Sequence, residues 1–184
     1  LDRTGSGKFE LAVVSTGSPI VLLSYDENKG LTDKASEAGL SGSPNALSIT
    51  GIPSFSGATN LFVGTEEKNL FFVNNGKGSF RELAVNSGIV DPKFRTLGAT
   101  TADLNADEIP DLIYVNHFGP IRLLTQNRNL EFTDVTPEEM KTELAVQTPV
   151  VGDFNLDGEE DLYLNNIREA NVLFARKSGR WMVV

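Results

Sequence analysis

The sequence predicts an all-β protein built from repeated four-stranded sheets, and three observations lead to this. Strand-like segments dominate the chain, because short runs rich in β-branched and aromatic residues alternate with Gly, Asn, Pro and Asp. These runs are 10–15, 20–25, 70–74, 111–116, 121–125 and 161–165. Helical periodicity is nearly absent, apart from one turn expected at 136–142, with Thr136 as its cap and Pro137 at its first position. The runs also recur at a fixed spacing.

The first strand of each repeat carries a leucine in the same register. The four leucines lie roughly 50 residues apart, at Leu11, Leu61, Leu112 and Leu162. The next strand aligns as S-P-I-V-L-L, K-N-L-F-F-V, G-P-I-R-L-L and A-N-V-L-F-A. A third element follows at 31–40, 80–89 and 132–136, and a fourth strand leads into the next repeat at 46–51, 97–103 and 149–153. The repeats therefore start near residues 1, 52, 103 and 153 and cover 1–184 as a single domain.

Repeats of this length with four strands are typical of β-propeller blades. Each blade is buried by its neighbours on both faces, so its strands are apolar almost throughout, as in D-L-I-Y-V and I-V-L-L. Most propellers hold more than four blades, since an open arc leaves apolar faces exposed. We therefore expect an arc of about four blades from a larger propeller. Because the chain begins at Leu1 without an initiator Met, we also expect a processed form, an engineered fragment or the ordered part of something longer. The alternative is a small closed propeller or a sandwich built from the same hairpins.

The composition excludes several classes of protein. The net charge of −9 argues against nucleic acid and anionic membrane surfaces as partners, whereas it suits divalent cations or a basic protein. The absence of cysteine excludes disulfides and thiolate metal sites. No apolar run has the length of a membrane-spanning helix.

Two acidic loops repeat one ligand pattern, D103-L-N-A-D-E-I-P-D111 and D153-F-N-L-D-G-E-E-D161. Side-chain oxygens recur at loop positions 1, 3, 5 and 9, which are Asp103, Asn105, Asp107 and Asp111 in one loop and Asp153, Asn155, Asp157 and Asp161 in the other. Hard oxygens that converge on one point are the ligands of Ca²⁺, and the carbonyl groups of Ile109 and Glu159 at position 7 would complete the shell. The sequence thus predicts two calcium sites.

Other interpretations of these loops are weaker. An EF-hand requires flanking helices and a Glu at position 12, but that position is Leu164, inside a predicted strand. Magnesium prefers fewer protein ligands than this pattern offers. Metal-free turns remain the alternative, because Asp and Asn are good turn formers.

The other two loops depart from the pattern. The second, 52–60, keeps Ser54, Ser56 and Asn60 but no carboxylate, so we expect no metal there. The N-terminal loop, 1–10, has a register that is ambiguous by one residue, with Asp2, Thr4 and Glu10 as possible ligands.

The segments D-F-N-L-D-G-E-E-D-L and D-L-N-A-D-E-I-P-D-L resemble the calcium loops of FG-GAP/VCBS repeats, the propeller blades of integrin α-subunits. The segment N-R-N-L-E-F-T-D-V-T, with S-E-A-G-L at 36–40 and N-S-G-I at 86–89, is similar to the cartilage-acidic-protein branch of that superfamily. The resemblance implies a seven- or eight-bladed propeller that binds calcium, lies in an extracellular, periplasmic or organelle-lumenal space, and acts in adhesion or assembly. Glu108 departs from the family, which has glycine at that position.

The sequence contains few residues that could form a catalytic site. The single histidine, His117, follows a strand, and neither a G-x-S-x-G elbow nor a zinc constellation accompanies it. The sequence therefore predicts no enzyme, but a non-catalytic calcium-binding module for protein–protein interaction or adhesion. The alternatives are a structural subunit of a large complex with incidental calcium and a carbohydrate-active propeller.

A basic segment near the C-terminus favours contact with a protein partner. It contains Arg168, Arg176, Lys177 and Arg180, and Trp181 follows. Arg and Trp are frequent interface anchors, although a tryptophan in the final strand is more often part of the blade core.

Overall fold

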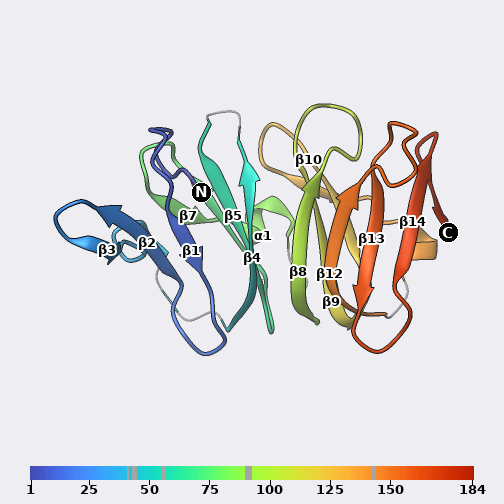
Figure 1. Ribbon diagram of the computed structural model, residues 1–184, viewed down its shortest axis with the longest axis horizontal. Helices are drawn as coiled ribbons and strands as arrows, with labels where there is room; N and C mark the ends of the chain where they lie inside the picture. Colours follow the sequence, from blue (N-terminus) through green and yellow to red (C-terminus); the bar gives the residue numbers. More distant parts are fainter. Residues whose placement is uncertain (41, 43–44, 55–56, 90–92, 142–143) are drawn as a thin grey trace. The chain divides into compact units, whose positions relative to one another are not determined.

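The computed structural model describes residues 1–40, 42, 45–54, 57–89, 93–141 and 144–184, and its regular structure is almost entirely β (Figure 1). The chain divides into two compact units, Leu1–Lys93 and Phe94–Val184. Among the described residues, no helix is long and apolar enough to cross a membrane.

The first unit contains two antiparallel sheets. One has the order β1 (Leu11–Val13), β2 (Val21–Asp26), β3 (Gly30–Asp33). The other has the order β4 (Ala46–Pro53), β5 (Thr59–Thr65), β6 (Leu70–Asn74), β7 (Phe80–Glu82) and is followed by the short helix α1 (Ala84–Ser87). Apolar side chains of both sheets, among them Leu22, Leu61 and Phe72, form one buried cluster. The two sheets are therefore packed against each other through a shared core.

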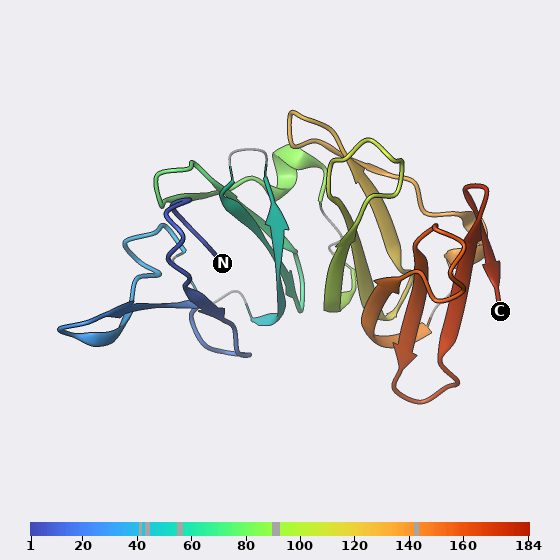
Figure 2. The same cartoon turned by 45° about the horizontal axis from the view of Figure 1, so that its top comes forward.

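The second unit contains two four-stranded meanders, shown from a second direction in Figure 2. The first consists of β8 (Arg95–Ala102), β9 (Asp111–Gly119), β10 (Arg122–Gln126) and β11 (Phe132–Asp134), followed by the 3₁₀ turn η1 (Glu138–Met140). The second consists of β12 (Leu144–Gly152), β13 (Asp161–Asn166), β14 (Val172–Lys177) and β15 (Arg180–Val183). Because the start of β12 also pairs with the end of β9, the two meanders are joined at one edge.

The expected strands are confirmed, and their burial explains their composition. All residues of β5 from Asn60 to Thr65 are buried, and so are those of β9 from Asp111 to Asn116. Such strands lie between two packed layers, so they lack the polar alternation of a strand with one solvent face. Trp181 packs, half-buried, against the core of the second unit, as expected for a final-strand tryptophan.

The helical segments differ from the expectation. Helix α1 was not predicted; it ends at Gly88, which has a left-handed backbone (φ +80°) and donates its N–H to the Val85 carbonyl. A turn does form within 136–142, but Thr136 does not cap it, because the Thr136 hydroxyl accepts the N–H of Leu123 at 2.9 Å. Pro137 precedes the turn, and Thr142 lies outside the described residues.

Candidate calcium loops

The two acidic loops, 103–111 and 153–161, have the same local structure. The position-1 carboxylate closes each loop by accepting two backbone N–H groups. Asp103 accepts those of Asp107 (3.1 Å) and Glu108 (2.9 Å). Asp153 accepts those of Asp157 (3.1 Å) and Gly158 (2.9 Å). The equal spacing in the sequence therefore becomes equal geometry in the fold.

The side chains at positions 3 and 5 bind the loop backbone in the same way. The amide oxygens of Asn105 and Asn155 accept the N–H groups of Asp107 (3.1 Å) and Asp157 (2.8 Å). One oxygen of each of these aspartates accepts the N–H at position 7, at 2.8 and 2.9 Å. Both loops thus present an amide and two carboxylates on a hydrogen-bonded turn, and these three side chains are exposed or half-buried in each loop.

The position-9 carboxylates, Asp111 and Asp161, are fully buried. One oxygen of each accepts the N–H of the position-2 residue, from Leu104 at 2.7 Å and from Phe154 at 3.0 Å. The other accepts a strand N–H of the same sheet, from Gln126 at 2.7 Å and from Arg176 at 2.8 Å. These aspartates therefore tie the loop to the third strand of each meander, a role that the spacing alone did not reveal.

Burial raises the pKa of Asp111 above its usual range. The hydrogen bonds from the N–H groups of Gln126 and Leu104 act in the opposite direction, and the nearby charges of Asp107 and Asp103 raise the pKa further. The ionised loop thus holds a buried negative charge among other negative charges.

The backbone explains how Glu108 replaces a glycine. It adopts a left-handed conformation, with φ +65°, where the equivalent Gly158 has φ +90°. Position 4 is left-handed as well, at Ala106 (φ +59°) and Leu156 (φ +62°). Each non-glycine residue in this region costs roughly 1 kcal/mol, and the hydrogen bonds of the loop offset that cost.

The N-terminal loop has the same backbone, which resolves its register. Gly5 and Gly7 are left-handed, with φ +68° and +78°, so they occupy positions 4 and 6 and Asp2 occupies position 1. Asp2 accepts the N–H groups of Thr4, Ser6 and Gly7 at 3.1, 3.2 and 2.6 Å. Glu10 therefore stands at position 9.

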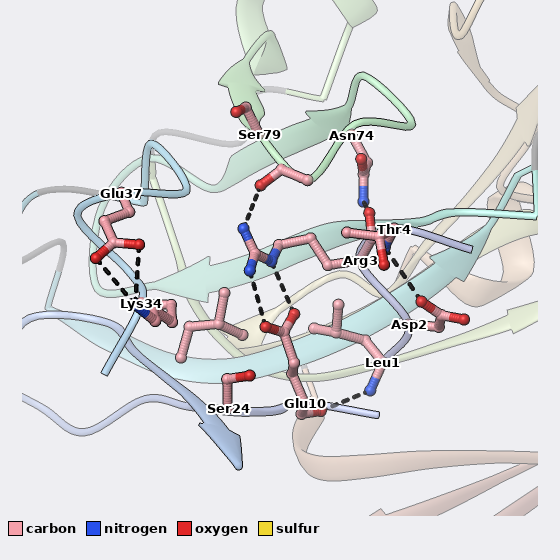
Figure 3. Close-up of polar contacts among 12 residues, drawn as sticks. Leu1, Asp2, Arg3, Thr4, Glu10, Ser24, Lys34, Glu37, Asn74 and Ser79 are labelled. Carbon is pink, nitrogen blue, oxygen red and sulfur yellow. Dashed lines mark hydrogen bonds and ion pairs between the residues drawn. The ribbon is translucent and has the colours of Figure 1, made fainter. Parts of the chain in front are cut away.

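In this loop a guanidinium binds the position-9 carboxylate (Figure 3). Arg3 donates from Nε to one Glu10 oxygen at 2.8 Å and from Nη2 to the other at 2.9 Å. The Glu10 side chain is 6% exposed, so both of its oxygens are used inside the protein. Arg3 also donates to the Gly78 carbonyl at 2.5 Å, and its contact with Glu10 raises the pKa of the guanidinium.

A side chain from the following sheet binds the carbonyl at position 2 in two of the loops. Asn74, at the end of β6, donates from Nδ2 to the Arg3 carbonyl at 2.9 Å. Arg176, in β14, donates from Nη2 to the Leu104 carbonyl at 2.5 Å. The two donors occupy equivalent positions, because the backbone N–H of each binds a position-9 side chain, that of Asn60 or Asp161. We call this contact the inter-repeat clasp. The sequence analysis did not predict it, although an alignment of β6 with β14 pairs Asn74 with Arg176.

The second loop has the expected lack of carboxylates. Its position-9 residue, Asn60, is buried, and the Ser54 hydroxyl donates to the Ala58 carbonyl at 2.6 Å. Ser56 lies outside the described residues. The expectation that this loop holds no metal stays a prediction.

The donor set of the two acidic loops fits Ca²⁺ in its chemistry, since all of its atoms are hard oxygens. Among the described residues, no three His, Cys, Asp or Glu side chains gather closely enough to hold a metal ion by themselves, so the predicted sites depend on the Asn and carbonyl oxygens as well. Glu159 offers only its carbonyl, because its carboxylate accepts the N–H groups of Ser178 (2.6 Å) and Gly179 (3.1 Å) in the β14–β15 turn.

Known proteins are similar to this chain in sequence. A family model described as an FG-GAP-like repeat matches residues 56–114 and again residues 103–164, and both matches contain the 103–111 loop. The chain belongs to the FG-GAP-like repeat family. This FG-GAP-like chain is 31% identical to cartilage acidic protein 1 of Mus musculus and 30% identical to that of Homo sapiens, over 95% of its own length. It spans about 30% of the length of these relatives.

A solved structure supports the fold. The described fold is similar to a chain in the crystal structure of BBS1N in complex with ARL6DN, soaked with lead, with a TM-score of 0.61 and 12% sequence identity. The match covers 99% of this chain and 50% of that one. At this identity the likeness speaks for the fold alone, and it agrees with the β-propeller arc that the repeat predicts.

Proposed function

We propose that this FG-GAP-like chain is a non-catalytic, calcium-binding β-propeller module that acts in protein–protein interaction or adhesion. The observation that carries the proposal is the repeated loop geometry. In both acidic loops a buried carboxylate at position 9 and exposed or half-buried oxygens at positions 1, 3 and 5 are held by the same hydrogen bonds.

The residues that would hold the two ions are those of the predicted pattern. They are Asp103, Asn105, Asp107, Asp111 and the Ile109 carbonyl in one loop, and Asp153, Asn155, Asp157, Asp161 and the Glu159 carbonyl in the other. A divalent cation would offset the repulsion among these carboxylates, which is one of the causes that raise the pKa of Asp111. Because the ion would bind the folded loops only, it would stabilise the fold.

The interaction role rests on the family and on how the acidic residues are used. The position-1, position-5 and position-9 carboxylates accept backbone N–H groups that shape the loops, which favours a structural use of these groups over acid–base catalysis. The named relatives are animal proteins called cartilage acidic protein 1. We propose an extracellular location for this chain, which the resemblance to this family supports.

The test of the calcium proposal is thermal unfolding in excess Ca²⁺ and in excess chelator. At a concentration of 100 Kd a ligand stabilises the folded state by about 2.7 kcal/mol, and this corresponds to a rise in Tm of about 5–10 °C for a chain of this size. In Asp153→Ala the rise should shrink. The matched control is Asp26→Ala, because Asp26 also accepts two backbone N–H groups, those of Asn28 and Lys29, but lies in a hairpin turn outside the loops.

The control variant should keep the full calcium response. Equal melting of the wild type in calcium and in chelator would contradict the proposal and make the acidic loops metal-free turns.

A second candidate is a structural subunit of a large complex with incidental calcium. It is favoured by apolar side chains on the surface, such as Phe9, Tyr25 and Leu156 at 81%, 68% and 88% exposure. Instability of the isolated chain at every calcium concentration would support this candidate over the first.

A further inference from the structure

The second unit contains a cleft that lies outside the predicted calcium sites, although Glu159 of the 153–161 loop binds the backbone of Ser178 and Gly179 in its lining. It has a volume of about 700 Å³ and is lined by Pro137 and Glu139, beside the 3₁₀ turn η1, and by residues 177–182 of the β14–β15 hairpin. It therefore includes the centre of the basic segment for which the calcium loops give no role.

The lining of the cleft includes an aromatic side chain that is held in place. Trp181 packs against the core of the second unit, and the Arg176 guanidinium lies 5.6 Å from the centre of its ring system. Beside it, Met182 is 49% exposed. A ring that is fixed in this way offers an apolar surface that loses little conformational entropy on binding.

Two cations flank this surface. Lys177 and Arg180 face each other across the hairpin, and both are exposed. Within the described part of the chain neither forms an ion pair, whereas the nearby Lys141 binds Glu138 at 3.0 Å. In a chain with a net charge of −9, this local excess of positive charge is suited to an acidic partner.

We propose that the cleft docks an acidic peptide segment of a partner protein, with an apolar side chain on Trp181 and carboxylates at Lys177 and Arg180. This inference rests on the proposed interaction function and adds its surface and the chemistry of its partner. A peptide fits better than a sulfated polysaccharide, because Trp181 can contact an apolar side chain and because Glu139, which also lines the cleft, repels a continuous polyanion more than a peptide with separated carboxylates.

The single tryptophan of the chain makes the cleft directly observable. The 184-residue chain is used to select binders from a random peptide display library that lacks tryptophan, and the enriched peptides are synthesised. We expect peptides that combine several Asp or Glu residues with an aliphatic or phenylalanine side chain. Their binding should change the emission of Trp181 and should weaken as the salt concentration rises.

The deciding variant is the charge reversal Lys177→Glu/Arg180→Glu, which should weaken binding about tenfold or more. Its matched control, Lys29→Glu/Lys77→Glu, makes the same change of charge at exposed lysines of the first unit and should leave the affinity unchanged.

Three results would overturn the proposal: no enriched peptide, binding that both variants weaken equally, or heparin binding at Trp181 with no acidic peptide bound. Thermal unfolding of the charge-reversal variant in calcium and in chelator separates the two claims. If the charge-reversal variant keeps its calcium response but loses peptide binding, the result supports the proposed docking cleft. If the wild type shows no calcium response, the result refutes the calcium sites and leaves the cleft proposal standing.

Discussion

Replacing the buried Asp161 by asparagine separates its structural role from metal binding. Its two carboxylate oxygens accept the N–H groups of Phe154 at 3.0 Å and of Arg176 at 2.8 Å, and the residue is fully buried. Asparagine has nearly the same shape but only one acceptor oxygen, so one of the two N–H groups would face an NH₂ donor.

The expected loss of stability in Asp161→Asn follows from these contacts. One unsatisfied buried N–H group costs about 1–3 kcal/mol, and the remaining hydrogen bond loses its charge assistance. Removing the buried charge returns part of this free energy, since burying an ionised carboxylate is itself unfavourable. We expect Asp161→Asn to lower the free energy of unfolding by about 2 kcal/mol, which corresponds to a decrease in Tm of about 4–8 °C.

The assay is thermal unfolding in excess chelator, so that no calcium contributes. Asp157→Asn is the matched control: it is the same chemical change at an exposed position, and an amide oxygen can still accept the N–H of Glu159, which Asp157 now binds at 2.9 Å. The control should stay within about 0.5 kcal/mol of the wild type. If Asp161→Asn has the same Tm as the wild type in chelator, or if both variants lose equal stability, the structural role assigned to the position-9 carboxylate is wrong.

Three further predictions concern two contacts of the loops and the carboxylate of Asp33 in β3. Arg3→Met leaves the buried Glu10 carboxylate without its partner and should lower the free energy of unfolding by about 3 kcal/mol in a urea titration, while the double variant with Glu10→Leu should recover most of it. Arg176→Met removes the inter-repeat clasp from the Leu104 carbonyl and should speed amide hydrogen exchange in 103–111 but not in the N-terminal loop; unchanged exchange would contradict the clasp. Two backbone N–H groups lower the pKa of Asp33, so its ionised form stabilises the fold above the ordinary pKa of 3.8 and this contribution is lost as the pH falls below that value. Asp33→Asn should therefore show a smaller decrease of stability between pH 5 and pH 3 than the wild type, and an equal decrease would refute the assignment.

The strands could be predicted because their signal is local. A short run such as 70–74 has four apolar residues in succession before Asn74, and the predicted bounds are those of β6. The leucine register placed Leu61, Leu112 and Leu162 inside β5, β9 and β13, at equivalent points of successive sheets. The backbone of the acidic loops was also encoded locally, because each carboxylate at position 1 binds N–H groups four and five residues later.

Other features depended on the backbone conformation of single residues. The register of the N-terminal loop was ambiguous in the sequence and was decided by the left-handed Gly5 and Gly7. Helix α1 is only four residues long, which is too short for a helical period to appear in the sequence.

By itself, the sequence determined the repeat, the strands and the oxygen-rich loops, since each arises from residues that are close together in the chain. Only the tertiary structure decided which partners these loops bind. Arg3 reaches Gly78 and Arg176 reaches Leu104 across 75 and 72 residues. Such contacts form only when successive sheets are packed together, and the residue type that makes them differs between repeats, with Asn74 in one and Arg176 in another. The physical reason is that a hydrogen bond to a main-chain carbonyl selects position and direction, and places no demand on the sequence of the loop it binds.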